Sequence, residues 1–98
     1  MDKQIVITKL REHEPELRAA GIVHLRLFGS IARGQASAAS DVDLIADFDS
    51  NRRLSLVDMA GLENYLSDLL GVPVDLSPAN MLKEPVRERA AQEAVLAF

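Results

Sequence analysis

Two segments of the chain alternate apolar and polar residues, which is typical of a β-strand with one buried face. The first covers residues 22–28, and the second covers residues 41–48. In the first, the side chains predicted to face the core are Val23, Leu25 and Leu27. A third and shorter apolar segment, residues 72–76, contains Pro73, which favours a position at the edge of a sheet.

Apolar residues at helical spacing predict three helices, over residues 2–20, 55–70 and 85–98. Ser55 and Asp58 form a capping-box pattern at the start of the second helix. The residues between the first two strands are small and polar, with room for one short helical turn. The predicted order is therefore α-β-turn-β-α-β-α.

Because each predicted strand has one apolar face, the helices are expected to cover that face and leave the other polar. We predict an α+β fold with a small mixed three-stranded sheet and helices packed on one face. The 98 residues fit a single domain, residues 1–98.

Composition narrows the possible functions. The chain has no cysteine, which excludes disulfides and cysteine-ligated metals. The formal net charge of −4 disfavours direct binding of nucleic acid, which needs a basic surface, and suits a basic protein partner or a metal–nucleotide complex. The charged N-terminal segment has no long apolar run, so we expect neither a signal peptide nor a membrane span, and a cytoplasmic location.

Asp41 and Asp43 are the first candidate site residues. Residues two apart on a strand point to the same face, about 6.6 Å apart along the chain. Two neighbouring carboxylates repel each other unless a cation lies between them, and Mg²⁺ prefers such oxygen ligands. The alternative is a solvated strand face, although aspartate is uncommon in strands.

Gly29 and Ser30 follow the first strand directly. Glycine permits close approach of the backbone to a ligand, and Ser30 could cap a helical turn whose N–H groups bind an anion. The alternative for this dipeptide alone is an ordinary turn with a helix cap. Ten residues separate Ser30 from Asp41, so a phosphate cradle and a metal-binding pair would lie at successive strand ends.

The segment that contains both features reads LFGSIARGQASAASDVDLIADF. It resembles the signature of the DNA-polymerase-β-like nucleotidyltransferases, and in particular the minimal nucleotidyltransferases. The resemblance implies a third carboxylate on the next strand, where Asp75 stands, and two Mg²⁺ ions held by Asp41, Asp43 and Asp75. It also implies ATP as nucleotidyl donor and phosphate binding by Gly29 and Ser30.

Arg33 lies within the same motif, where it would contact phosphate or pair with a carboxylate to brace the loop. Ser40 is expected to brace the loop before the carboxylates. Asp47 shares the carboxylate face about 13 Å beyond Asp43 and is expected to be solvated. His24 and Arg26 project onto the same face, as surface residues or at the edge of the site.

Minimal nucleotidyltransferases resemble antitoxins that pair with HEPN-domain toxins, which are helical ribonucleases. The resemblance implies an enzyme that transfers AMP from ATP to a tyrosine of its cognate toxin. Two alternatives remain: a non-catalytic antitoxin that acts by complex formation, and a nucleotidyltransferase for small molecules such as aminoglycosides. A full set of carboxylates argues against the first alternative, and the short chain argues against the second.

Overall fold

A computed structural model describes residues 2–34 and 41–98 and confirms the α+β class. Its helical elements are α1 (Lys3–Glu12), α2 (Glu14–Ala19), α3 (Leu56–Leu70), α4 (Glu84–Glu93) and the 3₁₀ turn η1 (Ala79–Met81). Its strands are β1 (Ile22–Phe28), β2 (Val42–Phe48), β3 (Val74–Pro78) and β4 (Val95–Leu96). None of the helices in the described ranges is long and apolar enough to cross a membrane.

The sheet is mixed and has the strand order β3-β2-β1-β4. Strand β2 is antiparallel to β1 and parallel to β3, while β4 runs antiparallel to β1 on the far edge. The sheet therefore has four strands where the sequence predicted three. Because the two central strands are antiparallel, the end of β1 and the start of β2 lie at the same end of the sheet.

The extra strand comes from the segment 85–98, and the prediction of one helix over that whole segment was wrong. Helix α4 ends at Glu93, and Ala94 is already extended. The N–H of Ala97 donates to the carbonyl of Leu25 at 2.8 Å, and the Ala97 side chain is buried. Pairing with the edge of β1 satisfies backbone groups that would otherwise be unpaired, and here it overrides the helical spacing.

The predicted N-terminal helix is also divided in two. Helix α1 ends at Glu12, His13 separates the helices, and Pro15 occupies the first turn of α2. Proline lacks an N–H and clashes with the preceding turn, so it is tolerated at a helix start but not inside a continuous helix.

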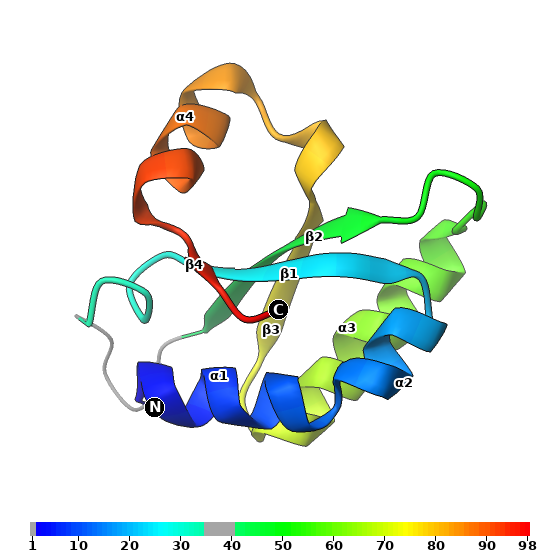
Figure 1. Cartoon of the computed structure of the whole chain (residues 1–98), viewed down its shortest axis with the longest axis horizontal. Helices are drawn as coiled ribbons and strands as arrows, with labels where there is room; N and C mark the ends of the chain where they lie inside the picture. The colour runs from blue at the N-terminus through cyan, green and yellow to red at the C-terminus, as the bar shows by residue number, and fades with distance from the viewer. Residues whose placement is uncertain (1, 35–40) are drawn as a thin grey trace.

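The helices lie on both sides of the sheet in Figure 1, with α1, α2 and α3 beneath it and η1 and α4 above it, whereas the sequence predicted helices on one face alone. The main core fills the lower layer. The fully buried side chains there include Val6, Leu10, Leu17, Leu25, Leu27, Val42, Leu44, Leu66 and Leu70. A capping box formed by Ser55 and Asp58 starts α3, as the sequence predicted.

One strand residue faces away from the core that the alternation assigned to it. The register between β1 and β2 shifts between Ile22 and His24. A bulge of this kind places two consecutive residues opposite one partner and breaks the strict alternation. Ile22 is therefore buried, while Val23 is 36% exposed, contrary to the prediction that Val23 faces the core.

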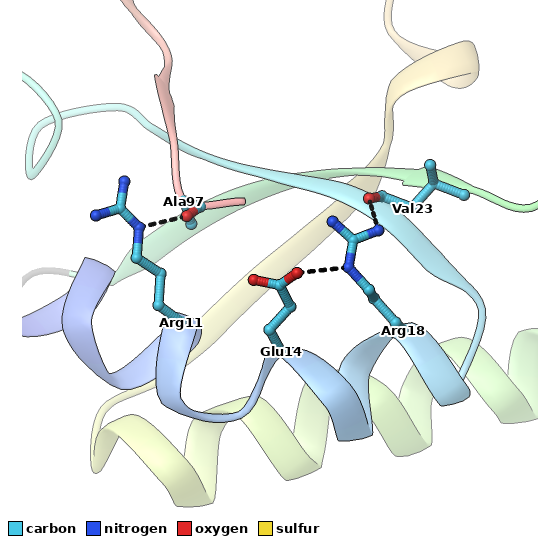
Figure 2. A network of polar contacts seen from close by, with 5 residues as sticks. All are labelled: Arg11, Glu14, Arg18, Val23 and Ala97. Atoms are coloured by element: carbon cyan, nitrogen blue, oxygen red, sulfur yellow. Dashed lines mark hydrogen bonds and ion pairs between the residues drawn. The ribbon is translucent and has the colours of Figure 1, made fainter.

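Polar contacts tie the N-terminal helices to the far edge of the sheet (Figure 2). Arg11 Nε donates to the carbonyl of Ala97 at 2.7 Å, and Arg18 donates to the carbonyl of Val23 at 2.8 Å. Arg18 also pairs with Glu14 at 2.7 Å, one helical turn before it. These contacts hold the C-terminal strand and the start of β1 against the helical layer.

Candidate active site

Asp43, the second residue of β2, lies between two other features of the predicted site. Its antiparallel partner on β1 is Phe28, the residue before Gly29, and its parallel partner on β3 is Asp75. Paired residues on neighbouring strands point to the same face, and the strands lie about 4.8 Å apart. The register therefore brings together the carboxylates of Asp43 and Asp75, which are 32 positions apart in the sequence.

Burial and neighbouring negative charges raise the pKa of the Asp43 carboxyl group. Burial makes the largest contribution, followed by the negative charges of Asp75 and Asp41, while the positive charge of Arg33 acts in the opposite direction. Asp43 is half-buried, whereas Asp41 and Asp75 are exposed. The negative charges of Asp41 and Asp75 thus act on Asp43, and a cation among the three carboxylates would relieve that repulsion.

Gly29 passes directly over the carboxylate of Asp43. A Cβ placed on Gly29 would lie 2.3 Å from Asp43 Oδ2, and Gly29 has a φ of +82°. Both observations require glycine at this position, since other residues have a Cβ and rarely adopt this conformation. The glycine of the predicted phosphate cradle is therefore in contact with the central carboxylate of the predicted metal site.

A short helical turn follows Gly29, as the sequence predicted. Its hydrogen bonds run from the N–H of Arg33 to the carbonyl of Gly29 at 3.2 Å, and from the N–H of Gly34 to that of Ile31 at 3.0 Å. Ile31 is buried and anchors the turn in the core, while Ser30 is half-buried at its start.

Arg33 reaches from this turn to the last helix. Its Nη1 lies 3.3 Å from Glu93 Oε2 at the end of α4. Of the two roles predicted for Arg33, pairing with a carboxylate therefore has a structural partner, while contact with phosphate stays a prediction. Glu93 was not identified from the sequence, because it lies 60 residues away and belongs to no motif. Ser40 lies outside the described residues.

Asp47 lies farther along the same face of β2 and has a partner of its own. Arg26 Nη1 contacts Asp47 Oδ2 at 2.6 Å, and both side chains are a little over one-third exposed. The expectation of a simply solvated Asp47 was therefore incomplete. The pair lies beyond Asp43 in the direction of the C-terminal end of β2.

The chemistry of the carboxylates suits a hard divalent cation, which prefers oxygen ligands. Within residues 2–34 and 41–98, no three acidic, histidine or cysteine side chains are placed so that together they could hold a metal ion. The ligands present are one half-buried carboxylate, Asp43, with two exposed carboxylates near it. This open arrangement fits an ion that arrives with its substrate rather than a permanently enclosed metal.

Comparison with known proteins identifies the family. The model of the nucleotidyltransferase domain matches residues 6–97, which is nearly the whole chain. The chain belongs to the nucleotidyltransferase domain family. The resemblance drawn from the Gly29–Ser30 and Asp41–Asp43 motif is confirmed, and the protein is a nucleotidyltransferase by family.

Curated relatives of this nucleotidyltransferase have similar length. The protein adenylyltransferase MntA of Thermococcus cleftensis is 39% identical over 87 residues, covering 88% of this chain and 86% of the relative. A protein of Methanocaldococcus jannaschii, named as a candidate protein adenylyltransferase, is 35% identical over 88 residues, covering 89% of this chain and 88% of the relative.

Solved structures share the fold of this nucleotidyltransferase. A candidate minimal nucleotidyltransferase matches with a TM-score of 0.78 and 40% identity, over 97% of this chain and 95% of the other. A toxin–antitoxin with AMP-PNP matches at 0.72 and 19% identity, over 100% and 73% of the two chains. A tri-AMPylated Shewanella oneidensis HEPN toxin in complex with an MNT antitoxin matches at 0.70 and 17%, over 98% and 71%. The last two show similarity of fold alone.

Proposed function

We propose that this nucleotidyltransferase is an antitoxin that transfers AMP from ATP to a tyrosine of a cognate HEPN-domain toxin. One observation carries the proposal. Gly29, Asp43 and Asp75 come from three separate segments and lie next to one another where β1 ends and β2 and β3 begin. A backbone turn suited to phosphate and a set of carboxylates suited to a cation are the two requirements of a metal–triphosphate site.

The residues of this site have distinct proposed roles. Gly29 and Ser30 hold the β- and γ-phosphates through the backbone of the turn, because its first N–H groups precede the hydrogen-bonded part. The carboxylates of Asp41, Asp43 and Asp75 would hold two Mg²⁺ ions. When bound, Mg²⁺ supplies neutralisation of the triphosphate charge and a lowered pKa for the attacking hydroxyl.

The reaction is an in-line displacement at the α-phosphorus of ATP. The oxygen of the acceptor hydroxyl forms a bond to that phosphorus, the bond to the bridging oxygen of the β-phosphate breaks, and pyrophosphate leaves. The hydroxyl proton passes to the carboxylate of Asp75, which is exposed and therefore open to an incoming acceptor. Catalysis rests on positioning and electrostatics rather than on a covalent enzyme intermediate.

The partner is supported by relatives and by charge. A 39% identical relative carries the name protein adenylyltransferase MntA, and a structure of the same fold is a complex of an AMPylated HEPN toxin with an MNT antitoxin. The net charge of −4 suits a basic partner that itself binds RNA.

The test uses the full chain, Mg²⁺, a lysate of its host, and ATP labelled at either the α- or the γ-phosphate. Label that enters a protein from the α-position alone is expected, and mass spectrometry of the band should find AMP on a tyrosine of a HEPN protein. Asp43→Asn should abolish labelling, while the matched change Asp68→Asn, at an exposed position of α3, should preserve it.

The outcomes distinguish the candidate functions. Label on a small molecule rather than on protein would favour the small-molecule enzyme. No label from either position, together with recovery of an intact toxin complex, would support a non-catalytic antitoxin and contradict the proposal.

A further inference from the structure

A cavity of about 470 Å³ lies between the second face of the sheet and helix α4. Arg26 of β1 and Ile45 and Asp47 of β2 form its floor, and Leu82, Ala90 and Ala91 contribute to the opposite wall. Figure 1 shows α4 and η1 on this side of the sheet, opposite the three helices that cover the main core. The volume falls in the range of roughly 300–1,000 Å³ that is typical of small-ligand clefts.

The cavity begins next to the catalytic carboxylates. Ile45 follows Asp43 by two residues and therefore shares its face of β2, about 6.6 Å farther along the strand. The strand register agrees, because Ile45 is paired with Arg26 just as Asp43 is paired with Phe28. A group in the cavity could thus present one end to the site around Asp43.

The lining of the cavity combines apolar side chains with four polar or charged ones, which are Arg26, Asp47, Asn80 and Arg87. Ile45 is only 4% exposed, although it lies on the face of β2 that also carries Asp43 and Asp47. Ala90 of α4, above that face, is only 8% exposed. The ion pair of Arg26 with Asp47, at 2.6 Å, lies at the end of the floor away from Asp43. A flat ring could pack against Ile45 and Ala90, with its one polar atom directed at Asp43 and away from that ion pair.

The direction of the reaction indicates which substrate enters. In an in-line displacement, the attacking oxygen and the leaving group lie on opposite sides of the phosphorus. The Gly29 turn, which would hold the leaving pyrophosphate, lies beyond Phe28 and so on the N-terminal side of Asp43 along β2. The cavity lies on the C-terminal side of Asp43, opposite the Gly29 turn. An acceptor bound in the cavity would therefore approach from the side opposite the leaving pyrophosphate.

We propose that this cavity binds the aromatic side chain of the acceptor tyrosine, with the ring between Ile45 and α4 and the hydroxyl directed at the carboxylates. The assignment rests on the proposed adenylyl transfer to tyrosine. It makes Ile45, Ala90 and Ala91 determinants of acceptor specificity, and it leaves the nucleoside of ATP outside the space beneath α4.

The test follows the methyl NMR signals of Ile45, Leu82 and Ala90 in the full chain, which report on the cavity without requiring turnover. N-acetyl-tyrosine amide is titrated in the presence of Mg²⁺ and an ATP analogue that cannot be cleaved between its α- and β-phosphates. N-acetyl-leucine amide is the control probe. We expect saturable shifts of these methyl groups with the tyrosine probe and much smaller shifts with the leucine probe.

Two variants make the test specific. Ala91→Trp fills the cavity from an exposed helix position, and Gln92→Trp adds the same bulk to the next residue of α4, which does not line the cavity. Ala91→Trp should abolish the shifts and raise the KM for the acceptor more than about tenfold through lost positioning, with the Kd of the ATP analogue unchanged. Gln92→Trp should leave the methyl shifts, the KM for the acceptor and the Kd of the ATP analogue unchanged. Circular dichroism checks that both variants fold.

Several results would overturn the assignment. If the ATP analogue alone shifts these methyl groups, or if Ala91→Trp weakens its binding, the cavity holds the nucleoside instead. If neither the probes nor the analogue shift these signals, the cavity is not the acceptor site. The same holds if Ala91→Trp transfers AMP to the toxin as well as the wild type does. A chain that binds the tyrosine probe but labels no protein retains this assignment and contradicts the proposed function.

Discussion

The backbone of Gly29 lies so close to Asp43 that a Cβ at position 29 would stand 2.3 Å from the Oδ2 of that carboxylate. The position of the turn after β1 therefore depends on the position of the Asp43 side chain at the start of β2. A chain with a larger residue at position 29 would have to move either the turn or the carboxylate, and with it the geometry of the proposed metal–triphosphate site.

Gly29→Ala should consequently reduce both stability and transfer. The methyl group adds the clash with Asp43 to the strain of a left-handed conformation, so the free energy of unfolding should fall by about 1–3 kcal/mol. Transfer of labelled AMP should fall by about 10²-fold or more, because a displacement of about 1 Å at a reacting centre has effects of this size. Denaturant unfolding and the α-labelled ATP assay measure the two effects.

Gly71→Ala is the matched control for that change. Gly71 has a similar φ of +73°, but a Cβ there would meet no atom within 4 Å. It should therefore cost stability through strain alone and leave transfer intact. Equal losses of activity in the two variants would show that contact with Asp43 is not what makes Gly29 necessary.

The raised pKa of Asp43 predicts a dependence of stability on pH in the absence of metal. Burial and the charges of Asp75 and Asp41 disfavour the ionised form, so the folded chain holds this proton more tightly than the unfolded chain does. The resulting contribution to stability is fully present below the unfolded-state pKa, about 3.9 for aspartate, and is lost as the pH rises through the folded-state pKa.

Asp43→Asn removes the charge that is disfavoured, so it should be more stable than the wild type at pH 7 without metal, and this advantage should shrink as the pH falls towards 4. Addition of Mg²⁺ should raise the Tm of the wild type more than that of the variant, because ligand binding stabilises the state that binds it. Thermal unfolding across pH, with and without Mg²⁺, measures both. A wild type that is more stable than Asp43→Asn at pH 7 without metal would contradict the electrostatic argument.

The contact between Arg33 and Glu93 separates two possible roles for Arg33. If Arg33 affects ATP binding only through its ion pair with Glu93, then Arg33→Gln, Glu93→Gln and the double variant should raise the KM for ATP by the same small factor. If Arg33 also contacts phosphate, Arg33→Gln should raise that KM by a further factor of about ten, as loss of a charged hydrogen bond implies. Steady-state kinetics on the three variants distinguish the two.

Much of the candidate site could be located from the sequence because its residues lie in short local patterns. Gly29–Ser30 and Asp41-x-Asp43 stand at the ends of strands that alternate clearly, and the apolar faces fixed which side the aspartates occupy. Asp75 could be assigned through resemblance to the family, and the parallel register with Asp43 now gives its position a structural basis.

The features that were missed depend on contacts between distant segments. Strand β4 forms because the edge of β1 offers unpaired backbone groups, which no helical spacing within residues 85–98 can reveal. Glu93 acquires a partner only when α4 is placed over the turn, and Ile45 becomes a cavity floor only when α4 covers it. The bulge that exposes Val23 arises from pairing with β2 and leaves no mark in the alternation itself.

The hydrogen bond from Arg11 to the carbonyl of Ala97 predicts how the C-terminal strand is held. Arg11→Gln removes a partly buried contact of 2.7 Å between residues 86 positions apart, and the free energy of unfolding should fall by about 1–2 kcal/mol. The matched change Arg53→Gln, at an exposed position outside the helices, should have little effect on the free energy of unfolding.

Because the hydrogen bond lost in Arg11→Gln lies at the edge of the sheet, hydrogen exchange of the Ala97 amide, which donates to Leu25, should accelerate more than exchange within β2. Equal acceleration at both places would indicate that Arg11 supports the whole fold, with no particular role at β4.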